Sequence, residues 1–312
     1  MWGWDLRNPG KVFALALAYL WVSSCGEQNL PVTRSLRVNI PIAWSATHIF
    51  VAPHPDDWQL FMGEYAYDLI RSADSKVVVI TTDAGDDGLG ADYWQAREKG
   101  NLGSVRNALG YSIFDGDPGE IADTVLLHGK TITHHTLRNV EMYSLRLPDG
   151  EINGEGTAPA NWQSLLKLYR AKINSIQSID KVNTFTLSEL RAVLAGIIER
   201  EYTDRSQAVR FYIQDPGSED NFSHSDHLVT ELLAREQIGN YQYSPCKAIA
   251  FEDYRIKGKT INLSKGVAAK KVLLFSGYDS VMIHNVGVCS LCQKSHYDWL
   301  QRSYHKEYEC AN

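Results

Sequence analysis

The segment from residue 48 to residue 81 restricts the fold more than any other part of this chain. A short apolar run, 48–52, is followed by apolar residues spaced three and four apart over 58–69, and then by the β-branched run 76–81. Apolar residues at that spacing share one face of a helix, whereas short β-branched runs bounded by polar residues are typical of buried strands. A strand, a helix and a second strand in this order form a βαβ unit. The pattern therefore predicts an α/β fold.

The same alternation continues along the rest of the chain. Thr186 and Glu189 have the spacing of a capping box, which opens one of the further helices. We expect a single domain over residues 45–312, a Rossmann-like three-layer sandwich with a mainly parallel sheet and an insertion near residues 111–180. Helices are predicted over 92–109, 162–172, 187–201 and from Ser225, and strands over 138–147, 208–213 and 247–254.

The composition is that of a globular protein. Hydrophobic residues make up 44% and charged residues 22% of the 312 residues, which excludes a disordered or collagen-like chain. The formal net charge is −6 and the isoelectric point is near 5.9. Because binding to a nucleic-acid backbone requires a clustered basic surface, nucleic acid is excluded as a partner.

The first residues of the chain predict export. Arg7 and Lys11 precede the apolar run 12–22, which is shorter than the roughly 20 residues of a membrane-spanning helix and is typical of a signal peptide. The run ends in Val-Ser-Ser-Cys-Gly, which resembles a bacterial lipobox with Cys25 as the lipidated residue. We therefore predict a lipoprotein-type signal peptide over 1–24, a tether over 25–44 and a lipid-anchored protein of the bacterial cell envelope. An ordinary signal peptide with a chance cysteine, or an uncleaved anchor, is the alternative.

Four further cysteines lie in the last third of the chain. In an oxidising compartment such thiols pair, and four cysteines allow three sets of pairings between which the sequence does not choose. Cys289 and Cys292 have the two-residue spacing of a zinc knuckle or a redox pair, but no second pair of this kind accompanies them. Disulfides are therefore favoured over a metal site for Cys246, Cys289, Cys292 and Cys310.

His134 and His135 form a histidine pair in the middle of the chain. No carboxylate lies at helical spacing from either residue. We therefore expect both imidazoles to be solvated and to have no part in the chemistry.

Two polar segments contain most of the candidate chemistry. Pro-His-Pro-Asp-Asp at 53–57 directly follows the first predicted strand, and Ser-His-Ser-Asp-His at 223–227 follows a later strand and precedes a helix. The carboxyl ends of parallel strands lie at one edge of the sheet, where ligands collect. Together the segments supply two imidazoles and a carboxylate for a metal and leave a position for water, the pattern of a catalytic zinc site. Alone, each segment also suits a turn, a helix cap or surface histidines.

The type and order of these two segments resemble the LmbE/PIG-L family of zinc-dependent de-N-acetylases. Members of that family have His-Pro-Asp-Asp after the first strand and His-x-Asp-His late in an α/β domain, and the resemblance covers about residues 48–254. The resemblance implies zinc held by His54, Asp57 and His227, Asp56 as general base, His224 as the polarising or acid group, and Asp226 orienting His224. It also implies that Arg97 and the loop containing Asp83 lie on the substrate side.

Three positions depart from the family pattern. Trp58 stands where the family usually has glutamate, and Ser225 stands where it often has proline. Phe222 occupies a place where some members have a tyrosine, whose hydroxyl would bond the reacting oxygen. None of these changes removes an implied ligand or base, so they concern substrate choice and rate more than the class of reaction.

The resemblance and the residues together predict an enzyme that requires Zn²⁺. The expected reaction is removal of the N-acetyl group from an N-acetylglucosamine-containing sugar or glycoconjugate, with release of acetate. The alternative is a non-catalytic envelope lipoprotein that binds glycans on the same fold. A metallopeptidase is less favoured, because the chain has no His-Glu-x-x-His helix.

Overall fold

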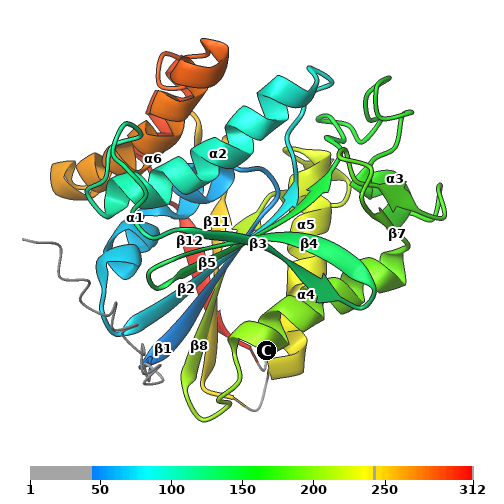
Figure 1. The fold of residues 1–312 in the computed structure, drawn as a ribbon, viewed down its shortest axis with the longest axis horizontal. Helices are drawn as coiled ribbons and strands as arrows, with labels where there is room; N and C mark the ends of the chain where they lie inside the picture. The colour runs from blue at the N-terminus through cyan, green and yellow to red at the C-terminus, as the bar shows by residue number, and fades with distance from the viewer. Residues whose placement is uncertain (1–43, 242–243, 311–312) are drawn as a thin grey trace, which may run out of the picture. The chain divides into compact units, whose positions relative to one another are not determined.

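The computed structural model describes residues 44–241 and 244–310 and shows an α/β fold with one large sheet (Figure 1). The eight strands of this sheet follow the order β12-β11-β8-β1-β2-β5-β4-β3, and the strands from β11 to β5 run parallel. The predicted α/β class with a mainly parallel sheet is confirmed. The strands are β1 Ala46–Ala52, β2 Ser75–Asp83, β3 Ile121–Leu127, β4 Lys130–Leu137, β5 Val140–Leu147, β8 Ala208–Asp215, β11 Cys246–Glu252 and β12 His305–Glu309. The helices are α1 Asp57–Arg71, α2 Ala91–Ala108, α3 Leu165–Tyr169, α4 Leu187–Glu201, α5 Ser225–Ile238, α6 Lys265–Val286 and α7 Lys294–Leu300. Short pairs β6 Ile176–Gln177 with β7 Thr184–Phe185 and β9 Gly217–Ser218 with β10 Asn221–Phe222, and the single turns η1 Gly239–Tyr241 and η2 Tyr254–Ile256, complete the elements.

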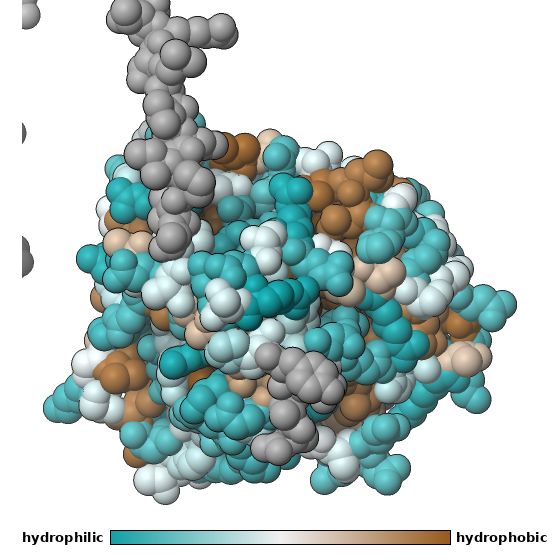
Figure 2. Space-filling model, turned by 90° about the horizontal axis from the view of Figure 1, so that it is seen from below, coloured by the Kyte–Doolittle hydropathy of each residue, from teal (hydrophilic) through white to brown (hydrophobic). Residues whose placement is uncertain are grey.

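Helices cover both faces of the sheet and make three layers (Figure 1). Along β1, Ile49 and Val51 belong to the core shared with α4 and α5, whereas Phe50 and Ala52 belong to the core shared with α1, α2 and α6. Because successive residues of a strand point to opposite faces, a strand buried on both sides has a continuous apolar sequence. On the face shown in Figure 2, hydrophobic residues lie in separate patches among hydrophilic ones.

The predictions for the start of the chain lie outside the described residues. They are the signal peptide over 1–24, the lipidation site Cys25 and all but the last residue of the 25–44 tether. Among the helices of the described part, none combines the length and the apolar character required to cross a membrane.

Helices α2 and α6 come into contact through glycines. A Cβ on Gly277 would lie 2.3 Å from the carbonyl oxygen of Gly103, and a Cβ on Gly103 would lie 2.8 Å from the carbonyl oxygen of Gly277. Any larger residue at either position would therefore push the two backbones apart. Gly103 weakens the intrinsic helix propensity of α2, but its lack of a side chain lets α6 pack against α2.

The region predicted as an insertion is partly integral to the sheet. β5 pairs in parallel with β2, and β4 and β3 continue the sheet as antiparallel strands. Residues 148–183 lie outside this sheet, and the helix predicted over 162–172 is shorter, Leu165–Tyr169. Its predicted start was wrong because Asn161 and Trp162 have φ values of 54° and 57°, in the left-handed region. The capping box of α4 is confirmed.

His134 is buried, so the expectation of a solvated pair was wrong for this residue. Only 4% of it is exposed, and its ring nitrogens lie 2.7 Å from Asp123 Oδ1 and 2.8 Å from Glu141 Oε2. The prediction failed because both carboxylates come from neighbouring strands and not from helical positions. Burial lowers the pKa of His134, but the two carboxylates outweigh burial and raise the pKa above its ordinary value.

This raised pKa predicts a pH-dependent contribution to stability. The folded state binds the proton more tightly than the unfolded state, so the contribution is complete below pH about 6.5 and is lost as pH rises through the raised native pKa. We expect His134→Gln to lower the free energy of unfolding by about 1 kcal/mol at pH 6 and by less at pH 9, measured by urea denaturation. Thr136→Val removes a non-titrating donor to Glu141 and should cost the same at both pH values. Equal losses for His134→Gln at the two pH values would contradict the assignment.

The structure pairs the cysteines as Cys246 with Cys310 and Cys289 with Cys292. The Cys246–Cys310 bond joins the end of the edge strand β12 to β11 and links residues 64 positions apart in the sequence. The Cys289–Cys292 bond links residues only 3 positions apart. A disulfide that closes a longer loop removes more entropy from the unfolded chain. We expect Cys246→Ser/Cys310→Ser to lower the free energy of unfolding by about 2–4 kcal/mol, and Cys289→Ser/Cys292→Ser to lower it by less than half as much. Chemical denaturation without reductant measures both, and similar losses would contradict this ranking.

Candidate metal centre

The candidate site lies where the order of the strands reverses. β1 has β2 on one side and β8 on the other, and loops at such a point in a parallel sheet diverge and leave room for a ligand. His54 follows β1, whereas His224 and His227 follow β8 and begin α5. The structure thus brings the two predicted segments together, and their side chains, with Asp149 from a third segment, form two groups able to hold a metal ion.

The first group contains His54, Asp57 and His227, the three residues implied as zinc ligands. Asp57 Oδ2 lies 2.9 Å from His54 Nδ1 and 3.3 Å from His227 Nε2, and all three side chains are buried. The backbone N–H of His54 also donates to Asp57 Oδ2 at 3.0 Å, which fixes the carboxylate at the start of α1. Ligand atoms of a tetrahedral zinc site with bonds of about 2.0–2.3 Å lie a little over 3 Å apart, so this spacing fits such an ion.

Asp253 holds the ring of His227 from the other side. Its Oδ2 lies 2.8 Å from His227 Nδ1 and also accepts a hydrogen bond from the Ser223 hydroxyl. With the proton on Nδ1, the lone pair of His227 is on Nε2, which is buried and has no hydrogen-bond partner among the described residues. A metal-binding imidazole has this arrangement, with one nitrogen on the ion and the other on a carboxylate. The orphaned Nε2 therefore fits a metal.

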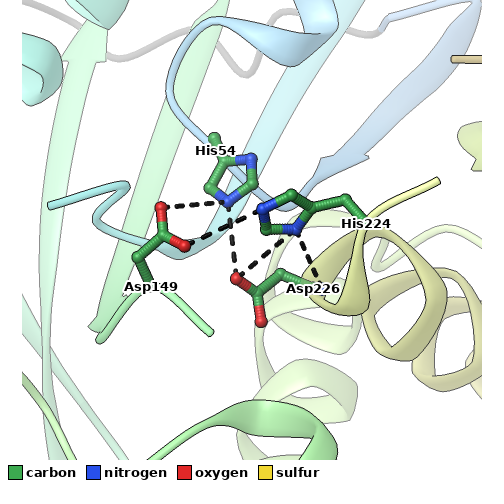
Figure 3. Close-up of side chains that lie close together, drawn as sticks. All are labelled: His54, Asp149, His224 and Asp226. Carbon is green, nitrogen blue, oxygen red and sulfur yellow. Dashed lines mark hydrogen bonds and ion pairs between the residues drawn. The ribbon is translucent and has the colours of Figure 1, made fainter. Parts of the chain in front are cut away.

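The second group joins His54 to Asp149, His224 and Asp226 (Figure 3). His54 Nε2 lies 3.7 Å from Asp149 Oδ2 and 3.5 Å from Asp226 Oδ2. His224 lies 3.8 Å from each of the same two carboxylates. Sequence reasoning missed Asp149 and Asp253. Asp149 lies just beyond the end of β5 and Asp253 just beyond the end of β11. An acidic residue at such a position is the sequence feature that could have identified them.

His54 belongs to both groups because its two ring nitrogens face opposite ways. Nδ1 faces Asp57, and Nε2 faces Asp226 and Asp149. If Nδ1 binds the metal, Nε2–H points to carboxylates, as Nδ1–H of His227 points to Asp253. Both imidazoles of the first group then have a carboxylate behind them. The two imidazoles are not equivalent, because His54 Nε2 lies 3.5 Å and 3.7 Å from its carboxylates and makes no hydrogen bond among the described residues, whereas His227 Nδ1 lies 2.8 Å from Asp253.

His224 is held as a neutral donor. Its Nδ1 accepts the backbone N–H of Asp226 at 3.3 Å, which leaves the proton on Nε2. Burial lowers the pKa of His224, and the neighbouring imidazoles of His54 and His227 lower it further. The carboxylate of Asp226 accepts from the backbone N–H of Gly150 at 2.8 Å and lies nearer His54 than His224. Asp226 thus orients His224 through its amide and His54 through its carboxylate.

Asp56 stands beside the ligand set and pairs with Arg97. The guanidinium donates to Asp56 Oδ1, to the carbonyl of Gly85 at 2.7 Å and to the hydroxyl of Tyr278 at 3.0 Å. Burial lowers the pKa of Arg97, but Asp56 and the two neighbouring tyrosines raise it well above its usual value. Asp83 is buried and accepts the backbone N–H of Gly85 at 2.7 Å. The substrate contacts implied for Arg97 and Asp83 stay predictions.

Tyr254 forms an aromatic wall next to the centre. Its ring centroid lies 4.7 Å from that of His227 and 4.7 Å from that of Trp299, on which it stacks. Trp299 is buried in α7, so the tyrosine ring is fixed from behind. The position of Tyr254 directly after Asp253 means that one short turn supplies both a carboxylate and a hydrophobic cover to His227.

No protein-family model matches the chain, and no curated protein matches it. The fold and the site together therefore define the protein as an α/β protein with a buried histidine–aspartate centre able to hold a metal ion.

The role of Asp253 can be tested through metal affinity. Loss of a carboxylate that orients a metal-binding histidine weakens metal binding by about 10- to 100-fold, so we expect this loss for zinc in Asp253→Asn. Glu252→Gln alters the preceding residue, whose carboxylate pairs with Lys259, and should leave zinc affinity unchanged. Titration against a competing chelator measures both, with circular dichroism as the check on folding. Wild-type affinity in Asp253→Asn would exclude His227 as a ligand oriented in this way.

Proposed function

We propose that this protein is a zinc-dependent N-deacetylase of the LmbE/PIG-L type that hydrolyses the acetamide of an N-acetylglucosamine-containing sugar or glycoconjugate. The observation that carries the proposal is the convergence of His54, Asp57 and His227 from two distant segments, with the separate carboxylate of Asp56 beside them. A purely structural metal site has no use for an adjacent unligated base. We also propose that the protein is exported and anchored through Cys25.

The residues of the centre divide the reaction between them. A bound zinc ion would act as a Lewis acid on the acetamide carbonyl and lower the pKa of water to about 7. Asp56, held in place by Arg97, accepts the proton of the attacking water. His224 donates its Nε2–H to the oxygen that becomes negative, a contribution on the order of 3 kcal/mol. Asp56 then gives the proton to the leaving nitrogen as the C–N bond breaks, so one water is consumed and acetate and a free amine form.

The test distinguishes the role of Asp56 as the base from the role of His54 and His227 as metal ligands. We expect zinc-loaded wild type to release acetate from N-acetylglucosamine or its oligomers, and Asp56→Asn to lose 10²- to 10⁴-fold of that rate while it keeps zinc. Asp92→Asn, an exposed acid in the first turn of α2, is the matched control and should keep full activity. The double variant His54→Ala/His227→Ala should lose zinc, measured by elemental mass spectrometry.

Two results would overturn parts of this proposal. Full activity in Asp56→Asn would show that another group is the base. Zinc-loaded wild type that releases no acetate from any N-acetylated sugar would exclude the hydrolase and leave a glycan-binding envelope protein as the better account.

A further inference from the structure

The two edges of the large sheet differ in their protection against pairing with another strand. Natural sheets protect an exposed edge with charged residues, proline, bulges or a very short strand, because unpaired backbone N–H and C=O groups bind other strands. At one edge, four of the five residues of β12 can carry a charge: His305, Lys306, Glu307 and Glu309. β3 at the other edge has seven residues, with one acid and no lysine, arginine or proline. This second edge therefore lacks most of the usual protection.

β3 is a regular strand with an open outer side. It pairs with β4 without a shift in register, from Ile121 with Thr136 to Leu127 with Lys130, so it contains no bulge. Within residues 44–241 and 244–310, no element pairs with its other side. The backbone groups along this side can therefore form a further ladder with an incoming strand.

The side chains of β3 make the open edge apolar. Leu126 is 73% exposed and Ile121 is 57% exposed, although both are large aliphatic residues. The single charged residue, Asp123, is paired within its own chain, because its Oδ1 lies 2.7 Å from Nδ1 of His134 on β4. A second strand on this edge would cover the aliphatic side chains and would meet no unpaired charge.

The strand is complementary to a copy of itself. If two β3 strands pair antiparallel about a two-fold axis at Thr124, the middle residue, all seven residues have a partner. The pairs across the axis are then Ile121 with Leu127, Ala122 with Leu126, and Asp123 with Val125. In this register no two like charges lie directly opposite each other, whereas an axis at Asp123 would place two carboxylates opposite each other.

The charges at the two ends of such a pair are also complementary. The acids Asp117 and Glu120 precede β3, whereas His128 and Lys130 follow it. Antiparallel pairing brings the start of one strand beside the end of the other, so acidic and basic residues meet at both ends. A second copy of this chain therefore fits the edge in backbone pairing, apolar contact and charge.

We propose that β3 is an interface for a second copy of this chain. The β3 strands of the two copies pair antiparallel about a two-fold axis at Thr124, and the two large sheets join into one. The same patch of each copy forms both sides of the interface, so the assembly closes as a dimer. The inference concerns an edge of the sheet and does not rest on the proposed function.

The test exchanges charges at the axis. Sedimentation velocity on the full-length protein between roughly 1 and 100 μM measures the association. We expect a concentration-dependent dimer in wild type, and association at least tenfold weaker in Thr124→Lys and in Thr124→Glu, because each variant places two like charges at the axis. An equimolar mixture of the two variants should dimerise again, because a lysine then faces a glutamate. Thr124 is exposed, so near-UV circular dichroism should show native folding in both variants.

A second pair of variants tests the apolar contact. Leu126→Lys replaces an exposed aliphatic side chain of the edge and should also weaken association at least tenfold. Ile261→Lys is the matched control, because Ile261 is also an exposed aliphatic residue, at 53%, and lies between η2 and α6, outside β3. It should associate as wild type does.

Three results would overturn this interface. The first is a wild type that stays monomeric over the whole range of concentrations. The second is association that persists in Thr124→Lys and Leu126→Lys, since it would then come from another surface. The third is a mixture of Thr124→Lys and Thr124→Glu that stays monomeric, since two strands paired about Thr124 would bring the opposite charges together.

Discussion

The burial of Asp57 between two imidazoles is the interaction on which the rest of this structure depends. An isolated carboxylate loses several kcal/mol when it is taken out of water, so it requires partners on every side. Burial raises the pKa of Asp57, but His227 and His54 outweigh burial and hold the pKa well below its ordinary value. These partners come from the ends of β1 and β8, so the carboxylate is stable only where those strands are neighbours. The strand order and the charge arrangement therefore require each other.

Further carboxylates surround this group and give the centre an excess of negative charge. Asp149 and Asp226 face His54, and Asp253 faces His227. Burial raises the pKa of Asp226, as expected for a carboxyl group that has little water and acidic neighbours. A divalent cation among the ligands of the first group would offset this charge directly, and the surrounding carboxylates would then strengthen the imidazoles as ligands. The two groups are thus better understood as one candidate ion site with its supporting carboxylates than as two separate candidate sites.

The sequence predicted the parts of this arrangement that depend on local order. The two segments that contain His54, Asp57 and His227 were found because each follows a predicted strand, and the ends of parallel strands share one edge of the sheet. The choice of these three residues within the segments came from the family resemblance. Asp149 and Asp253 were not found, because their approach depends on β5 pairing with β2 and β11 pairing with β8. Those pairings join strands far apart in the chain and leave no periodic signal. The long helix α6 was not predicted either. It packs on α2 through backbone contact at glycines, which join residues far apart in the chain.

The centre and its surroundings differ in how they are built, and this difference bears on which of the two can vary. The candidate ligands stand at the ends of buried strands, whereas one wall of a neighbouring cavity of about 430 Å³ comes from the segment 148–183, which lies outside the large sheet. Hydrogen bonds from the Asp149 amide to Asp86 and from the Gly150 amide to Asp226 join this segment to the centre. Leu165, Leu168 and Ile176 anchor the segment in the core, and exposed side chains and left-handed turns lie between these anchors. Substitutions of its exposed residues can reshape this surface while the histidine–aspartate centre keeps its geometry, because the side chains of the centre stand at the ends of buried strands.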